Sequence, residues 1–257
     1  MSNSFKNISV IILVFLTGCA TSPQNPDPFE PVNRKIYQFN YSIDKAITKP
    51  IAKTYSRYTP NAVRQGVRNF FKNLGMISTT LNNIFQLKLH KTPDDILRFT
   101  LNTTVGVGGL FDVASRLGIP KNNEDFGQTL GHWGVSPGPY LMIPFIGPHS
   151  ARAALGRPVD IVANPISSLI NDPSITYPLA ALQITDTRAR LLTVTEIVDQ
   201  QFDPYTFIRD NYLKRREALI LDKNPSENNN SAGVIVPQKS LLEMEKELFG
   251  DEPLDHF

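Results

Sequence analysis

Apolar residues recur at spacings of three and four through much of the chain, which is the spacing of a helix with one apolar face. The first such stripe comprises Val32, Ile36, Phe39, Ile43 and Ile47. Comparable stripes occupy residues 60–74, 76–89, 92–101, 150–159, 186–198 and 203–219. Pro50, Gly75 and residues 105–109 interrupt the pattern, so we expect helices to end there. The sequence therefore predicts a mainly α fold.

Residues 127–148 depart from this pattern, because glycine and proline are mixed there with aromatic and aliphatic residues. No regular helix is expected over residues 134–148. Loops normally carry polar groups and lie in water, whereas this one is apolar. We therefore expect a hairpin or an irregular loop that is buried in protein or in lipid. A second loop is predicted around Pro165, Pro173 and Pro178.

The first residues have the features of a secretory signal. One lysine precedes a short apolar run over residues 8–15, and the run ends in Leu16-Thr17-Gly18-Cys19. Cys19 is the chain's single cysteine, so an internal disulfide is excluded, and its position matches a bacterial lipobox. An ordinary signal followed by a chance cysteine is the alternative. We expect residues 1–18 to be removed and Cys19 to carry diacylglycerol and an N-acyl chain.

The mature chain divides by composition. Residues 19–31 are rich in proline and polar groups and predict a tether, residues 32–221 a helical domain, and residues 222–257 an acidic, disordered tail. No later segment has the roughly 18 uninterrupted apolar residues of a membrane-spanning helix. Ala20 follows the cysteine where the signal for retention at the inner membrane has Asp. This favours an outer-membrane location, with the protein anchored by its lipid on the periplasmic face.

Charge is distributed unevenly along the mature chain. Residues 19–91 carry 11 Lys and Arg against three acids, a balance of 11 − 3 = +8. Residues 222–257 carry three Lys against eight acids, a balance of 3 − 8 = −5. A secreted, anchored chain meets anionic phospholipid headgroups, so no nucleic-acid partner is expected. The basic residues form either a surface for headgroups or a solvated helix face.

The chain lacks the patterns of known catalytic sites. His90, His132, His149 and His256 show no metal-ligand spacing, and no Gly-x-Ser-x-Gly elbow is present. The glycines at 106, 108 and 109 loosely resemble a phosphate loop, but a helix break explains them better. A triad of Ser136, His132 and Asp125 has only composition in its favour. We expect no enzymatic activity, no metal and no cofactor apart from the covalent lipid.

Several blocks between residues 16 and 220 together resemble one family, the MlaA (VacJ) outer-membrane lipoproteins. The blocks behind the lipobox are Asp27-Pro28-Phe29-Glu30-Pro31-Val32-Asn33-Arg34, Tyr37-Gln38-Phe39-Asn40-Tyr41, Leu101-Asn102-Thr103-Thr104-Val105-Gly106-Val107-Gly108-Gly109-Leu110-Phe111-Asp112-Val113-Ala114, Phe126-Gly127-Gln128-Thr129-Leu130-Gly131-His132-Trp133-Gly134-Val135, Gly138-Pro139-Tyr140-Leu141-Met142-Ile143-Pro144-Phe145 and Asp203-Pro204-Tyr205. The acidic tail matches none of the family's motifs.

The resemblance implies a ring-like bundle of amphipathic helices that lies in the membrane interface and surrounds a channel. It also implies work with a trimeric, OmpC/OmpF-like porin. Phospholipid misplaced in the outer leaflet would be removed and passed to an MlaC-like periplasmic carrier for retrograde transport, which maintains lipid asymmetry. A non-transporting scaffold lipoprotein of an outer-membrane assembly is the alternative function.

The resemblance also suggests functional residues. Asn40 and Tyr41 correspond to positions that control the channel opening; otherwise Asn40 is a local hydrogen-bonder and Tyr41 an interfacial or core aromatic residue. The apolar loop corresponds to a hairpin beside the channel. Its hinge candidates, or simple turn glycines, are Gly134, Gly138 and Gly147. Its membrane-facing candidates are Tyr140, Leu141, Met142, Ile143 and Phe145.

Overall fold

The computed structural model of the chain describes residues 26–170 and 172–222. The signal peptide, Cys19, most of the tether and the acidic tail beyond Asp222 lie outside the described residues. The prediction of a mainly α fold is confirmed. The elements are α2 (Glu30–Ile43), η1 (Asp44–Thr48), α3 (Lys49–Tyr58), α4 (Asn61–Phe85), α5 (Thr92–Thr104), α6 (Val113–Arg116), α7 (Phe126–His132), β1 (Tyr140–Ile143), β2 (Gly147–Ser150), α8 (Ala151–Ala163), α9 (Pro165–Leu169), α10 (Pro173–Arg190), α11 (Leu192–Asp199) and α12 (Pro204–Ile220).

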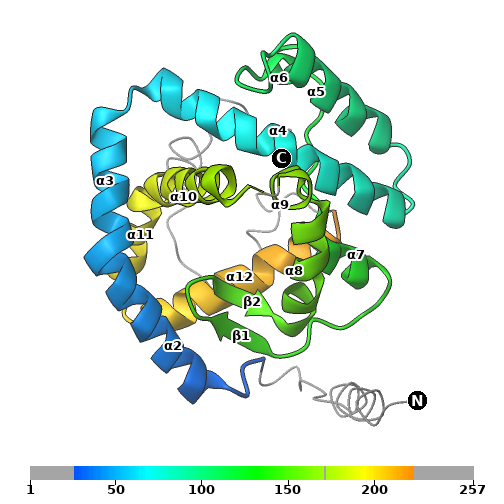
Figure 1. Cartoon of the computed structure of the whole chain (residues 1–257). Coiled ribbons are helices and arrows are strands. Elements are labelled where there is room, and N and C mark those ends of the chain that lie inside the picture. Colours follow the sequence, from blue (N-terminus) through cyan, green and yellow to red (C-terminus); the bar gives the residue numbers. More distant parts are fainter. Residues whose placement is uncertain (1–25, 171, 223–257) are drawn as a thin grey trace, which may run out of the picture.

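The helices follow one another around an open centre in the view of Figure 1. The first three elements form one side and α4 the next, with α5 packed on α4. The chain continues through α7, the hairpin and α8, and α12 returns beside α7 and β2. Helix α10 lies inside this path and packs against α3 and α4. Distant parts of the sequence are thereby brought together around one centre.

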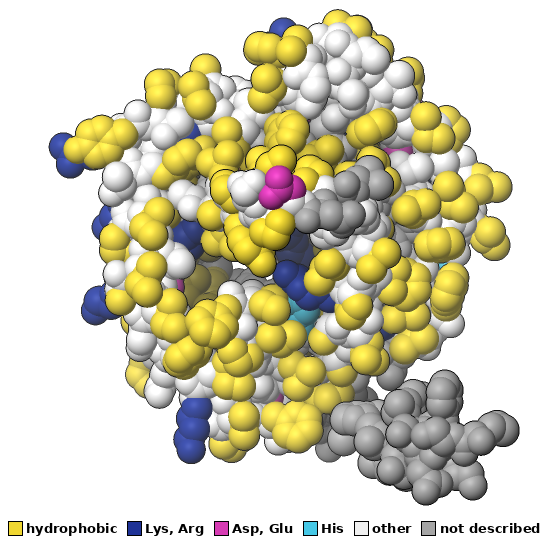
Figure 2. Space-filling view, viewed as in Figure 1, with side chains coloured by type: hydrophobic (Ala, Val, Ile, Leu, Met, Phe, Trp, Pro, Cys, Tyr) yellow, Lys and Arg dark blue, Asp and Glu magenta, His cyan; other side chains and the backbone are white. Residues whose placement is uncertain are grey.

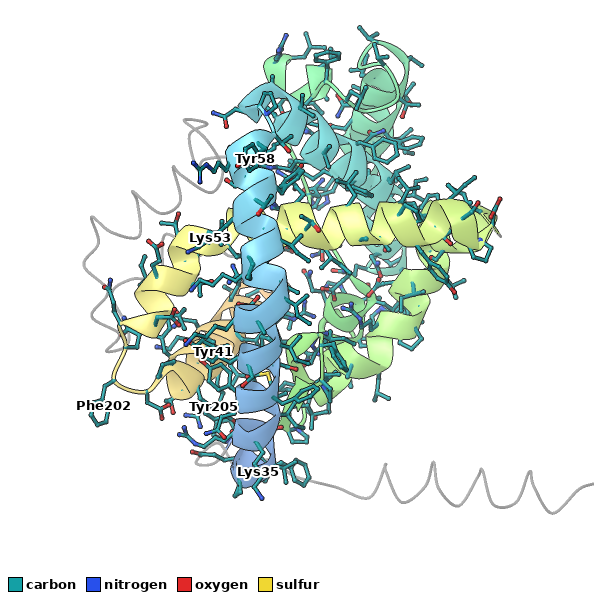
Figure 3. All side chains as sticks on the ribbon, turned by 60° about the vertical axis from the view of Figure 1, so that its left-hand side comes forward. Lys35, Tyr41, Lys53, Tyr58, Phe202 and Tyr205 are labelled. Atoms are coloured by element: carbon teal, nitrogen blue, oxygen red, sulfur yellow. The ribbon has the colours of Figure 1, made fainter. Side chains whose placement is uncertain are left out.

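The first side is one continuous helical rod made of α2, η1 and α3, which bends in the view of Figure 1 and runs upright in Figure 3. The prediction that Pro50 ends the first helix is wrong, because the chain stays helical to Tyr58. Proline removes an N–H donor and clashes with the carbonyl four residues earlier. The π-helical turn η1 lies just before Pro50 and widens the backbone at that point. The predicted break at Gly75 is also wrong, because α4 passes through it. The loop predicted around Pro165, Pro173 and Pro178 is wrong as well: Pro165 begins α9, Pro173 begins α10 and Pro178 lies inside α10.

The hairpin prediction for the glycine- and proline-rich segment is confirmed. Strands β1 and β2 pair antiparallel, with Tyr140 opposite Ser150 and Ile143 opposite Gly147. Alternate residues of β1 point inward, so Tyr140 and Met142 are buried in a cluster with Tyr205. Their prediction as membrane-facing residues is therefore wrong. Leu141, Ile143 and Phe145 keep exposed surface, in line with the alternation of a strand.

The described residues bury more polar side chains than apolar ones. Buried polar groups include Asn33, Asn83, Asp95, Arg98 and Thr129, and these are hydrogen-bonded to neighbours. Large apolar side chains are exposed on α2, α3, α4, α5, α8 and α10 and cover much of the face in Figure 2. None of the described helices is both long and apolar enough to cross a membrane. The fold thus presents apolar surface outward without a span.

Candidate functional site: the hairpin beside a central hollow

A hollow opens near the middle of the face in Figure 2, at the open centre of the ribbon in Figure 1. Apolar side chains surround it, and Lys or Arg and His side chains appear at its edge over the hairpin and α8. On those elements, Arg157 Nη1 lies 3.4 Å from His149 Nε2. The hollow therefore offers both apolar and basic surface.

Two asparagines of α2 fix the hairpin to the rod. Asn33 donates to the carbonyl of Tyr140 at 3.0 Å and accepts from the amide of Met142 at 2.9 Å. Asn40 donates to the carbonyl of Ile143 at 3.0 Å and accepts from the amide of Phe145 at 2.8 Å. The two residues are seven positions apart, so they project from one face of α2. That face therefore occupies the hydrogen-bonding edge of β1 and pairs its free groups.

The tip of the hairpin is apolar and exposed. Phe145 is 75% exposed and has a positive φ of 63°. Its ring meets that of Phe39 edge to face, with 5.3 Å between the ring centroids. Asn40 bonds the backbone on either side of Pro144, so its side-chain amide fixes the position of the turn. The predicted channel residue Asn40 thus acts directly on the hairpin tip.

A row of aromatic rings joins the hairpin to α2 and α12. Tyr41 stacks on Tyr37, Tyr37 meets Tyr205, and Tyr205 meets Tyr140, with centroid separations of 6.1, 5.9 and 6.1 Å. Burial and the hydrogen bond to Asp27 raise the pKa of Tyr205, so its hydroxyl stays protonated as a donor. The predicted role of Tyr41 at a channel opening stays a prediction.

The second strand is held by α12 and carries a shielded histidine. Tyr212 accepts a hydrogen bond from the amide of Ser150 at 2.9 Å, and its ring stacks on His149. Burial is the main cause that lowers the pKa of His149, and Arg157 and Arg216 lower it further, although the carbonyl of Gly147 opposes them. The imidazole is therefore mainly neutral at neutral pH, and the positive charge in this part of the hollow comes from arginine.

The three candidate hinge glycines all have positive φ: 85° at Gly134, 66° at Gly138 and 99° at Gly147. At Gly138 a Cβ would lie 2.9 Å from the Cβ of Ala151, so both the backbone and the packing require glycine. At Gly147 space is free, and the backbone alone favours glycine. These features explain the glycines as turn residues, and movement about them stays a prediction.

The Asp27–Arg34 block and the Asp203-Pro204-Tyr205 block lie next to each other. Arg34 binds both carboxylate oxygens of Asp203, at 3.0 and 2.6 Å, and its guanidinium lies 4.4 Å from the centroid of the Tyr205 ring. Arg209 of α12 lies 3.7 Å from Asp27 and 3.4 Å from Glu30. These contacts join the start of α2 to the start of α12.

This junction is expected to weaken in acid. The hydrogen bonds from Arg34 are the largest cause that holds the pKa of Asp203 well below its usual range. The folded-state pKa lies below that of the unfolded chain, so the stabilisation is present above about pH 4 and is lost as pH falls through the folded value. Arg34→Gln should lower the urea midpoint at neutral pH, and its deficit should shrink between about pH 5 and about pH 2.

Arg57→Gln is the matched control for this prediction, because Arg57 forms no ion pair with another described residue. Its urea midpoint should follow that of the wild type at every pH. A deficit of Arg34→Gln that stays constant across the series would contradict the assigned role of Asp203.

The hairpin contacts include three residues that were not predicted as site residues, namely Asn33, Tyr205 and Tyr212. Asn33 and Tyr205 belong to blocks that carry the family resemblance, but without an assigned role. The spacing of Asn33 and Asn40 was an available signal, because polar residues seven positions apart share a helix face. Nothing local in the sequence pairs Tyr212 with Ser150, since 62 residues separate them.

The alternatives based on catalysis do not find support in the geometry. Asp125 caps α7 through the amide of Gln128 and also binds Arg216, and no hydrogen bond joins it to His132 or Ser136 in the described part of the chain. The glycines after α5 form a tight turn, where a Cβ on Gly106 would lie 2.3 Å from the carbonyl of Asn102. The interpretation of these glycines as a helix break is confirmed.

The sequence matches one protein family along most of its length. Residues 25–219 match the family described as MlaA lipoprotein. The chain belongs to the MlaA family. The Escherichia coli (strain K12) intermembrane phospholipid transport system lipoprotein MlaA is 33% identical over 234 residues, which are 85% of this chain and 90% of the relative. A Rickettsia prowazekii protein is 37% identical over 195 residues, covering 76% of this chain and 78% of that protein.

A solved MlaA-family relative has the same fold. It was described in work on the structural basis for maintenance of bacterial outer membrane lipid asymmetry. The two chains align with a TM-score of 0.68 and 31% identity, over 76% of this chain and 98% of the other. The resemblance seen in the sequence motifs is thus confirmed, and the lipobox agrees with the family's description as lipoproteins.

Proposed function

We propose that this protein removes mislocalised phospholipid from the outer leaflet of the outer membrane and passes it to a periplasmic carrier. The hollow beside an apolar hairpin carries the proposal. A phospholipid has a charged head and apolar tails, so its path needs both kinds of surface. The basic and apolar groups around the hollow supply them. The names of the MlaA relatives support the same reading.

The distribution of apolar side chains supports a position in the membrane interface. Exposed apolar residues follow α5 and the turn before it, where Leu89, Pro93, Ile96 and Leu97 line a groove of about 460 Å³. Such a surface is unfavourable in water and stable against lipid. Helices that lie in the interface need one apolar face and no span. The lipid on Cys19 would hold the body at the periplasmic face of the outer membrane.

Anchoring by Cys19 leads to a test in cells. In a strain without this protein, outer-leaflet phospholipid should rise, because nothing removes it. The wild type should reverse the rise. Cys19→Ala should not, since the variant carries no lipid and lacks stable attachment to the membrane. An acylation or labelling assay selective for the outer leaflet measures the effect. If deletion leaves outer-leaflet phospholipid unchanged, the proposed lipid removal is contradicted and the scaffold function is favoured.

A trimeric porin and an MlaC-like carrier are the proposed protein partners. A porin would give a body at the inner leaflet access to lipid in the outer leaflet, and a soluble carrier would take the lipid across the periplasm. No cofactor is needed for this function, because the lipid moves without a change in covalent bonds.

A further inference from the structure

Five basic side chains meet where α3, α4 and α10 pack together. Arg64, Arg68 and Lys72 are spaced four residues apart on α4, so they lie on one face of that helix. Helix α10 packs beside α4 and adds Arg190, which is close enough to repel Arg68 and Lys72. Lys121, from the segment before α7, is close enough to lower the pKa of Lys72. We call these five residues the basic cluster.

The carboxylate of Asp186 offsets only part of this charge. Its Oδ2 lies 3.4 Å from Arg190 Nε, and its Oδ1 accepts a hydrogen bond from the hydroxyl of Tyr55 at 3.3 Å. Arg64 donates to the hydroxyl of Ser56 at 3.0 Å, which adds no negative charge. Among the described residues, Arg68 and Lys72 form no ion pair with a carboxylate. The positive charges of Arg68 and Lys72 are therefore not compensated by a carboxylate in contact with them.

Three buried donors in the cluster lack a hydrogen-bond acceptor. The Nε–H groups of Arg64, Arg68 and Arg190 have no hydrogen-bond partner in the described part of the chain, although Arg190 forms the ion pair with Asp186. Buried donors of this kind are rare, because each loses its hydrogen bonds to water without replacement. All five basic residues nevertheless keep some exposed surface. An oxygen-rich anion could therefore reach the cluster and accept from these groups.

Lys72 is the residue most affected by the uncompensated charge. Burial lowers its pKa to about 7, and the charges of Lys121, Arg190 and Arg68 contribute to the shift. Arg64, Asp186 and Tyr55 are the other charged or titratable groups of the cluster. An anion placed here would favour the charged ammonium. Binding would then be coupled to uptake of a proton near neutral pH.

We propose that the basic cluster is a binding site for a phosphate group, carried by a phospholipid headgroup or free in solution. Arginine presents a planar fork of donors that matches phosphate oxygens, and lysine adds a compact charge. A phosphate provides several acceptors for the unpaired Nε–H groups. The assignment of the phosphate group to a lipid rests on the proposed function, whereas the assignment of a phosphate site does not. In a lipid path, the site would hold the headgroup.

The test measures binding of dihexanoylphosphatidylglycerol, a short-chain phosphodiester lipid, to the purified full-length protein by calorimetry. The double variant Arg68→Gln/Lys72→Gln should bind at least about tenfold more weakly. The control Lys35→Gln/Lys53→Gln removes the same charge from exposed positions on the rod (Figure 3) and should stay within about twofold of the wild type. Thermal unfolding of the double variant should occur at or above the wild-type temperature, since two repelling charges are removed.

Two further probes separate the sources of phosphate. If inorganic phosphate binds as tightly as the lipid, and the double variant loses affinity for both equally, then free phosphate is sufficient to occupy the site. Weaker binding of inorganic phosphate, together with no binding of dihexanoylglycerol, identifies the lipid headgroup. Equal affinity of wild type and double variant for both phosphate probes overturns the inference. A protein that binds phosphate here but leaves outer-leaflet phospholipid unchanged in cells refutes the proposed function alone.

Proton coupling gives a second readout. The affinity of the wild type for the phosphodiester should fall at least about fivefold between about pH 6 and about pH 9, as Lys72 loses its proton. Lys72→Gln should lack this fall and bind weakly throughout. A pH dependence that survives in Lys72→Gln would count against the site, because the titrating group would then lie elsewhere.

Discussion

Asn33→Ala should lower the free energy of unfolding by about 3 kcal/mol, because it leaves two buried backbone groups without partners. The side chain of Asn33 is 2% exposed and bonds the carbonyl of Tyr140, the amide of Met142 and the carboxylate of Asp27. For a domain of this size the melting temperature should fall by about 6–12 °C. Urea and thermal unfolding followed by circular dichroism measure both quantities.

Asn40→Ala is the matched control on the same helix. Asn40 makes the same pair of bonds to β1 and the turn, but its bonded groups lie at the exposed end of the hairpin. Water can replace the lost partners there, so the expected loss is about 1 kcal/mol or less. Equal losses for the two variants would mean that burial does not set the strength of these contacts.

Phe145→Ser should reduce clearance of outer-leaflet phospholipid roughly tenfold while leaving folding unchanged. Phe145 stands at the hairpin tip beside the hollow with most of its ring exposed, so the folded protein loses little by the change. Contact of the ring with lipid is worth about 1.5 kcal/mol, at the lower end of the range for burying an aromatic side chain, and this amount corresponds to roughly a tenfold change in rate. The outer-leaflet acylation assay described above measures the effect.

Phe202→Ser controls for the loss of an exposed aromatic residue. Phe202 is 107% exposed before α12 and points away from the body of the molecule (Figure 3). Its replacement should leave clearance unchanged. Normal clearance in Phe145→Ser would favour the scaffold function, because a scaffold does not require an apolar hairpin tip.

The sequence was most informative where local chemistry decides the structure. The stripes that start at Ser150 and Asp203 become helices, and each of these two residues caps its helix, since its side-chain oxygen accepts a hydrogen bond from an amide of the first turn. The hairpin was also predictable from its glycines and prolines. These signals act over a few residues and need no tertiary partner.

The errors arose where tertiary contacts overrode local preference. Gly75 sits within α4, because the cost of glycine in a helix is small compared with the packing of a 25-residue helix. Tyr140 and Met142 looked like parts of a lipid-facing loop, yet strand alternation turns them into the cluster with Tyr205. Their partners lie on α2 and α12, far along the chain, so no local pattern could reveal them.

The single wide turn at η1 sets the rotational phase between the two halves of the rod. In an α-helix each residue advances the chain by about 100° around the axis, so one extra residue in a turn rotates everything beyond it by about that angle. The carboxylate of Asp44 in this turn accepts hydrogen bonds from Nε and Nη2 of Arg188 at 2.6 and 2.7 Å, which holds the turn against α10. Shortening the turn by one residue would keep the rod helical. It would also rotate Asn33 and Asn40 off the hairpin edge or rotate α3 off α10, so the length of this turn determines whether both interfaces can form together.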